Sequence, residues 1–177
     1  MSAPPRLRKA IVAVHVVSSV GWLGSVCAYL ALDVAAVTSR DIQLVRSAYV
    51  AMELIAYSAI VPLALATVVI GLLTAWSTPW GVLRHYWVIA KLLLTLLATA
   101  VLLVETQTIG ALADAALATR DPRELAGTLP HSIGGLIVLL TATVLSIFKP
   151  KGTTRYGWRK QQEQRRASAG AWRPTTS

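Results

Sequence analysis

Residues 10–32 read AIVAVHVVSSVGWLGSVCAYLAL, an apolar run of the length that crosses a lipid bilayer. Within this run His15 and Trp22 are seven residues apart, which places them two turns apart on the same face of a helix. An ionisable side chain inside a membrane helix costs free energy unless it meets protein, water, a metal or a cofactor. The stretch therefore predicts a membrane-spanning helix that carries a functional site at His15.

The composition of the whole chain agrees with a membrane protein. Of its 177 residues, 55% are hydrophobic and 14% are charged, and the mean hydropathy of +0.58 lies outside the range of soluble domains. Three further apolar segments follow the first. The sequence thus predicts an all-α fold, an integral membrane antiparallel four-helix transmembrane bundle with helices at about 10–32, 49–76, 86–106 and 131–148. Residues 1–150 would form the transmembrane domain.

The positive charge of the chain is concentrated in the tail formed by residues 151–177. The net charge of +9 is compatible with nucleic-acid binding, but most of the cations that follow the last apolar run lie in this tail, beside a membrane helix. Such a tail is typical of a cytoplasmic segment near anionic lipid headgroups, so no nucleic-acid partner is expected. We expect both termini to be cytoplasmic in a multi-pass protein of the bacterial inner membrane, and we expect the tail to be flexible or to lie on the membrane surface.

Local signals predict where the helices begin and end. Asp41 has the chemistry of a helix start, and Pro62 should kink the second helix or open a gap in its hydrogen bonds. The third helix can continue as far as Ala118. Asp121 and Pro122 indicate a cap and a short helix, which the Leu129-Pro130 pair should break before the fourth span.

Five residues are expected to gather in the cytoplasmic half of the bundle: His15, Trp22, His85, Trp87 and Lys91. Neutral imidazole is a common ligand of haem iron, and the interior of a four-helix bundle can hold a porphyrin. In a haem b site, His15 would be the first axial ligand and His85 the candidate second, while Lys91 or Arg84 would pair with a propionate. The alternative is that His15 only bonds a neighbouring helix and Lys91 reaches the interface over Trp87.

A second group, Glu53, Glu105 and His131, is expected near the outer face. Two carboxylates and an imidazole suit zinc, iron or manganese, so these residues are an alternative metal site. The competing interpretation is that both glutamates lie at helix ends in the headgroup zone, solvated or paired with Arg46.

Small and hydroxylated residues predict contacts between helices. Close approach of helices, and with it a possible homo-oligomer, is predicted from Gly21, Gly24, Gly134 and Gly135. Hydrogen bonds between helices are predicted for Tyr57, Thr67, Thr95 and Thr99. Motifs of soluble enzymes such as a P-loop or a Rossmann fingerprint do not occur, which leaves open whether the protein is an enzyme.

Three segments resemble a bacterial family of four-helix inner-membrane proteins that is defined by a domain of unknown function. These segments are 15–24 (HVVSSVGWLG), 78–95 (TPWGVLRHYWVIAKLLLT) and 134–152 (GGLIVLLTATVLSIFKPKG), and the resemblance covers nearly all of residues 10–157. The family implies a fold but no activity.

The His15/Trp22 and Trp87/Lys91 pairs are similar, more distantly, to motifs of the HemJ-type protoporphyrinogen oxidases and, more loosely, of the CopD-type copper-resistance membrane proteins. In the HemJ-type family the matching His is a haem b ligand and the matching Lys is required for function, which the resemblance implies for His15 and Lys91. The chain lacks the Pro-Arg pair that follows the first motif there, so the resemblance extends to haem binding and not to porphyrinogen oxidation. The leading hypothesis is therefore haem b binding for electron transfer or haem and porphyrin handling. The alternative is a small membrane carrier or accessory subunit for a metal ion, proton or solute, without haem.

Overall fold

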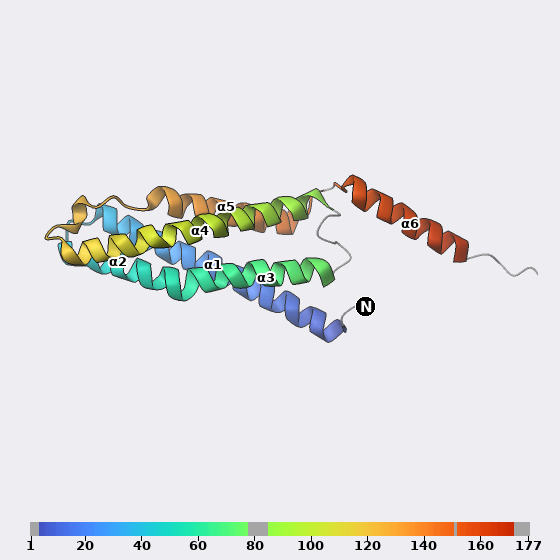
Figure 1. The fold of residues 1–177 in the computed structure, drawn as a ribbon, viewed down its shortest axis with the longest axis horizontal. Helices are drawn as coiled ribbons and strands as arrows, with labels where there is room; N and C mark the ends of the chain where they lie inside the picture. The colour runs from blue at the N-terminus through green and yellow to red at the C-terminus, as the bar shows by residue number, and fades with distance from the viewer. Residues whose placement is uncertain (1–3, 78–84, 151, 172–177) are drawn as a thin grey trace, which may run out of the picture.

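The structure is a computed structural model that describes residues 4–77, 85–150 and 152–171. Four helical stretches within these ranges are long and apolar enough to cross a membrane (Figure 1). The elements, in chain order, are α1 (Pro5–Thr38), α2 (Ile42–Ile55), the π-helical η1 (Ala56–Ile60), α3 (Val61–Ser77), α4 (Tyr86–Ala118), the 3-10 turn η2 (Pro122–Glu124), α5 (Leu129–Phe148) and α6 (Arg155–Ala171). The second stretch runs without interruption through α2, η1 and α3. The chain is a multi-pass membrane protein built from helices, as its composition predicts.

The exterior of the helices carries large apolar side chains, as expected for a surface in contact with lipid. Exposed examples come from all four stretches: Val17, Val20, Leu54, Val69, Leu97, Val104, Ile137 and Ile147. In water such a surface would be unfavourable, whereas hydrocarbon solvates it.

All four stretches are longer than the spans predicted for them, and α1 and α4 exceed the predictions most. α1 has 34 residues and α4 has 33, so each is about 50 Å long at ~1.5 Å per residue and extends beyond a hydrocarbon core of about 30 Å. The predicted continuation of the third helix to Ala118 is confirmed.

The Leu129-Pro130 pair does not precede the fourth helix but forms its first turn. Proline is tolerated there because the first backbone N–H groups have no partner inside the helix.

The predicted helix start and the predicted gap in the second stretch are both confirmed. The Asp41 side chain accepts a hydrogen bond from the backbone N–H of Gln43 at 2.9 Å and so caps α2. Pro62 has no N–H to give to the carbonyl four residues earlier. Just before Pro62 the backbone hydrogen bonds change register by one residue, since the N–H of Val61 bonds the carbonyl of Ala56, five residues earlier. The resulting π-helical turn is η1.

The four stretches surround a common centre. α1 packs against α2, α3 and α5, and α4 packs against the same three helices, so α1 and α4 face each other across the centre. Figure 1 shows the link between α1 and α2 at one end of the molecule, together with η2. The start of α1 and the end of α5 lie at the opposite end, where α6 begins.

The tightest packing lies toward the end that holds the α1–α2 link. Small buried side chains let the helices approach closely there: Ala36, Ala48, Ala56, Ala113 and Ala116. Arg46 closes the end of α4, since its Nε donates to the carbonyl of Ala116 and its Nη2 to that of Thr119, both at 2.8 Å. Arg46 is thus engaged with α4 carbonyls, and no ion pair with a glutamate is needed to explain its position.

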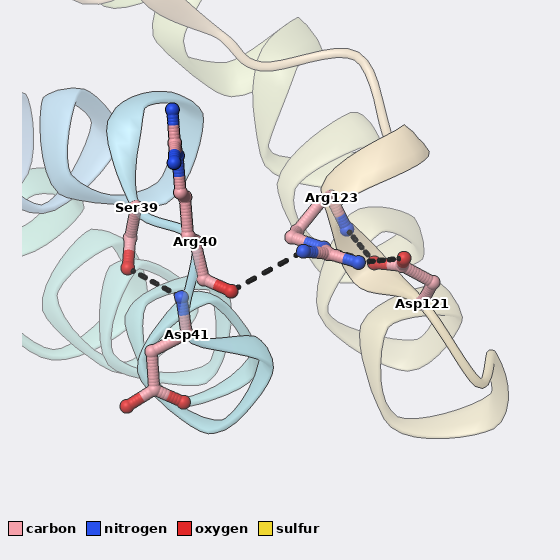
Figure 2. Close-up of polar contacts among 5 residues, drawn as sticks. All are labelled: Ser39, Arg40, Asp41, Asp121 and Arg123. Carbon is pink, nitrogen blue, oxygen red and sulfur yellow. Dashed lines mark hydrogen bonds and ion pairs between the residues drawn. The ribbon is translucent and has the colours of Figure 1, made fainter.

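The short helix predicted at Asp121-Pro122 is confirmed as η2, and Figure 2 shows how it is held. The Arg123 side chain forms an ion pair with Asp121, and its Nη1 donates to the carbonyl of Arg40 in the α1–α2 link at 3.3 Å. Hydrogen bonds from the side chain and backbone of Arg123 lower the pKa of Asp121 to about 2. This contact joins the end of α4 to the link between α1 and α2.

Asp33 is the buried ionisable residue that the sequence analysis did not single out. Its side chain is fully buried and accepts from the backbone N–H of Thr128 at 3.2 Å, from the Thr128 hydroxyl at 2.9 Å and from the Ser132 hydroxyl at 2.8 Å. The Tyr29 hydroxyl pairs with that of Thr128 at 2.9 Å. A carboxylate at a helix N-terminus is favourable, so this network ties α1 to the start of α5.

The tail is helical over most of its described length rather than flexible, which was one of the two predictions for it. Most of it forms α6, which projects away from the four packed stretches in Figure 1. Thr154 begins this helix, because its side chain accepts from the N–H of Gly157 at 3.0 Å and its carbonyl accepts from the N–H of Trp158 at 2.9 Å. Arginine, lysine, glutamine and alanine dominate α6 and all favour helix, which the charge-based argument overlooked.

Candidate functional site

A cavity of about 420 Å³ opens among α1, α3, α4 and α5 in the half of the molecule that holds the start of α1. Four of the five residues predicted to gather in this half line it: His15, Trp22, Trp87 and Lys91. They come from two helices that face each other, α1 and α4. Its volume lies within the range of small-molecule and cofactor pockets.

The His15 imidazole packs against a glycine of α3. A Cβ added to Gly71 would lie 3.0 Å from Cε1 of His15, which is closer than an ordinary contact, so any larger residue would require the ring to shift. Nδ1 of His15 is buried and has no hydrogen-bond partner, although the ring does interact with the backbone of Thr67. Since Nδ1 is closed to solvent, Nε2 is the candidate ring atom for a ligand in the cavity.

Thr67 carries the second buried polar atom without a partner, its Oγ1. It lies one turn before Gly71 in α3 and lines the same cavity. Many helical serines and threonines of the described chain donate to a carbonyl four residues earlier, as Thr74, Thr95 and Thr99 do. Thr67 lacks such a bond. Both unpaired buried atoms therefore belong to one site.

The hydrogen bonds predicted between helices are only partly correct. Tyr57 donates to the carbonyl of Thr106 in α4 at 3.0 Å, which confirms that prediction. Thr95 and Thr99 instead bond their own helix, at 2.7 and 2.8 Å, because the carbonyl one turn back is always within reach. The prediction for Thr67 is also wrong, as described above.

Positive charge surrounds the mouth of the cavity. Arg8, Lys91 and Lys149 line it, and no carboxylate is among the described residues that do so. Lys149 follows α5 in the left-handed conformation, with φ 43°, a position usually taken by glycine. A non-glycine residue there costs roughly 1 kcal/mol. The site therefore suits an amphipathic ligand that carries negative charge at one edge.

The structure does not bring His85 to this cavity. His85 precedes α4, its backbone pairs with that of Thr153, and its ring centroid lies 6.5 Å from that of Trp87. It thus lies beside the site rather than in its wall. Arg84, the alternative partner for a propionate, lies outside the described residues.

The outer group is divided in the structure. Nε2 of His131 lies 3.3 Å from Oε1 of Glu105, so these two residues pair. Glu53 instead lies beside Gly110, since a Cβ added to that glycine would be 3.5 Å from its Oε1. In the described ranges no three histidine, cysteine, aspartate or glutamate side chains are close enough together to hold a metal ion.

A second cavity, of about 290 Å³, lies next to the first along the centre of the helices. Trp22 and Leu139 line both cavities, and Trp22 is only 3% exposed, so its indole separates them. Glu105 and His131 line the second cavity. The polar residues predicted at two depths are thus associated with two separate spaces.

Sequence reasoning missed several residues of the first cavity: Arg8, Thr67, Gly71 and Lys149. Gly71 and Thr67 are four residues apart in an apolar helix, a spacing that places a small and a polar residue on one face. That pattern was a signal for a ligand-facing surface. The left-handed conformation of Lys149 has no comparable signal, because a lysine rarely adopts it.

Comparison with known proteins adds no relationship: no family model, curated protein or solved structure matches the chain.

Proposed function

We propose that the chain is an antiparallel four-helix bundle of the bacterial inner membrane with both termini in the cytoplasm. Arg6, Arg8 and Lys9 begin α1, and α6 carries a further group of cations at the same end of the molecule. Positive charge is retained on the cytoplasmic side of membrane proteins. The same charges favour contact of α6 with anionic lipid headgroups.

In this orientation the larger cavity would hold haem b, with Nε2 of His15 as a ligand of the iron. The observation that carries the proposal is the His15 imidazole in the wall of a 420 Å³ cavity lined by cations and by Trp22 and Trp87. Imidazole binds haem iron, and indole rings pack against the macrocycle. When bound, haem supplies an iron centre that exchanges one electron or takes up a further ligand.

The charged residues fit the other edge of such a ligand. Arg8 lies seven residues before His15, which is two turns or about 10 Å along α1 at ~1.5 Å per residue. Arg8 and Lys149 at the mouth, with Lys91 on the facing helix, neutralise the two propionates of haem. The role of these residues is to orient the ligand with its carboxylates toward the cytoplasm.

Among the described residues that line the cavity, His15 is the sole imidazole, and none of them carries a thiol or thioether. Haem proteins that shuttle electrons commonly hold the iron from both sides, whereas a single strong ligand leaves one side open. Of the two roles, haem and porphyrin handling is therefore favoured over electron transfer.

The test is the visible spectrum, oxidised and dithionite-reduced, of detergent-purified protein from haem-replete cells. We expect a Soret band in the wild type that is lost in His15→Ala and retained in His85→Ala, which is the matched control because His85 lies outside the cavity. A colourless wild type, or a His15→Ala variant with undiminished haem content, would refute the proposal.

A second candidate is a carrier without haem. It is favoured by the two cavities in line, with Trp22 and Leu139 between them, because a solute could pass from one to the other if these side chains moved. This function predicts that Trp22→Ala alters the uptake of a solute by proteoliposomes while the purified protein carries no chromophore. The spectrum therefore separates the two candidates.

A further inference from the structure

The smaller cavity differs in chemistry from the proposed haem site. Its wall consists mainly of apolar side chains from α1, α4 and α5, such as Val26, Leu102 and Val138. No lysine or arginine is among the described residues that line it. A ligand that fits here is uncharged and soluble in lipid.

Two flat surfaces face this cavity. One is the buried indole of Trp22. The other is the bare backbone of α5 at Gly134 and Gly135, where an added Cβ would meet nothing within 4 Å. Within the chain this glycine pair therefore does not bring helices into close contact, contrary to the prediction: the two residues line the cavity instead. An aromatic face and an open glycine backbone are surfaces on which a planar ring packs.

The Glu105–His131 pair supplies the polar contact. Glu105 is 19% exposed and His131 54% exposed, and their 3.3 Å contact spans α4 and α5 at the cavity wall. A carboxylate has about four lone-pair sites, so Glu105 keeps acceptor capacity beside its contact with Nε2 of His131. The hydroxyls nearby are engaged, since those of Thr128 and Ser132 donate to Asp33. These hydroxyls therefore do not donate to Glu105, and a donor group of a ligand can do so.

From these features we propose that the smaller cavity binds the ring of an isoprenoid quinol, with a ring hydroxyl donating to Glu105. A quinol is uncharged, planar and soluble in the bilayer. Its hydroxyl can donate a hydrogen bond to the carboxylate of Glu105. The oxidised quinone has only acceptors and binds less tightly. This inference goes beyond the proposed haem site and does not depend on it.

The probe is a quinol with a ten-carbon side chain, decylubiquinol, titrated anaerobically into the detergent-purified full chain by isothermal titration calorimetry. Decylubiquinone and dodecanol serve as comparison ligands. We expect the quinol to bind at least about tenfold more tightly than either of them. Equal binding of quinol and dodecanol would overturn the proposal, because it would mean that the site holds an alkyl chain without recognising a ring.

Two variants locate the binding. Gly135→Leu places a large side chain at the cavity wall, where its Cβ meets no atom within 4 Å, and should abolish binding. Ile137→Phe adds bulk on the exposed side of the same helix and should leave binding unchanged. Glu105→Gln keeps the shape and removes the charged acceptor, so the affinity should fall about tenfold, as for the loss of a charge-assisted hydrogen bond. Undiminished quinol binding by Gly135→Leu would overturn the proposal.

The outcome can be separated from that of the haem proposal. His15→Ala should remove the expected Soret band and leave quinol affinity unchanged. Gly135→Leu should keep the Soret band and abolish quinol binding. Lys91→Met, at the wall of the larger cavity only, is a further control that keeps quinol affinity. Loss of quinol binding in His15→Ala with a normal thermal unfolding midpoint would contradict a separate site.

Discussion

Replacing Asp33 by alanine should destabilise the protein more than any other single change of an acidic residue. The carboxylate accepts three hydrogen bonds from Thr128 and Ser132 inside a fully buried site. Its removal leaves a backbone N–H and two hydroxyls without this acceptor in the interior. Hydrogen bonds to a charged group contribute about 1.5–3 kcal/mol each, though not additively. We expect a loss of about 3–5 kcal/mol, the size observed when a buried charged group loses its partner.

Asp33→Asn is the graded variant. The asparagine oxygen can still accept from the Thr128 N–H, and the hydroxyls can rotate to accept from the amide, so the cost should be about 1–2 kcal/mol. Asp114→Ala is the matched control, because Asp114 is an exposed carboxylate on α4. Its effect should stay within about 0.5 kcal/mol, as is usual for surface positions.

The assay is reversible unfolding of the detergent-solubilised protein by increasing mole fractions of sodium dodecyl sulfate, followed by tryptophan fluorescence and far-ultraviolet circular dichroism. Two probes with coincident transitions justify a free energy of unfolding. If Asp33→Ala falls within about 1 kcal/mol of Asp114→Ala, the three hydrogen bonds do not stabilise the junction of α1 and α5, and the reasoning is refuted.

Three further predictions follow from single contacts. Thr67→Val removes a buried hydroxyl without a partner, so it should leave stability unchanged or raise it slightly; if Thr67 positions His15, the Soret maximum of bound haem should shift, as absorption spectra of the purified variants would show. Lys149→Gly relieves the left-handed backbone and should stabilise the fold by roughly 1 kcal/mol in the detergent unfolding assay, yet weaken haem binding in a spectroscopic titration through the lost cation. The depressed pKa of Asp121 stabilises the fold above the ordinary value of 3.8, and this contribution is lost as the pH falls through about 2. The difference in unfolding midpoint between wild type and Asp121→Asn should therefore shrink over that interval; a constant difference would contradict the Arg123 contact.

The fold could be predicted from sequence because it depends on signals that are local along the chain. Runs of apolar residues show the four stretches, Asp41 marks a helix start, and Pro62 removes one backbone donor. Each of these effects acts within one helix, so no knowledge of the partner helix is needed. The helix at Arg155–Ala171 was missed because charge was weighed as a lipid contact and helix propensity was not.

The site was only partly predictable, because it depends on how helices rotate against one another. Depth along the chain brought His15 and Lys91 to one level, and both line the larger cavity. Depth also favoured His85, but its position before α4 and its contact with Thr153 turn it away from the cavity. Asp33 was not singled out, since the helix rotation that buries it against Thr128 is set by packing and leaves no mark in a single sequence.

The tightest packing and the larger cavity occupy different parts of the molecule, and this division separates the effects expected at Asp33 from those expected at His15. The fully buried residues Val45, Met52, Ala56 and Ala116 lie toward the end with the α1–α2 link, where small side chains and capped helix ends hold the bundle. The wall around His15 is only partly buried, and it leaves two polar atoms unpaired, which costs stability unless a ligand compensates. A bundle held from one end can tolerate that cost at the other. Substitutions around His15 should therefore change binding with little effect on unfolding, whereas substitutions around Asp33 should do the opposite.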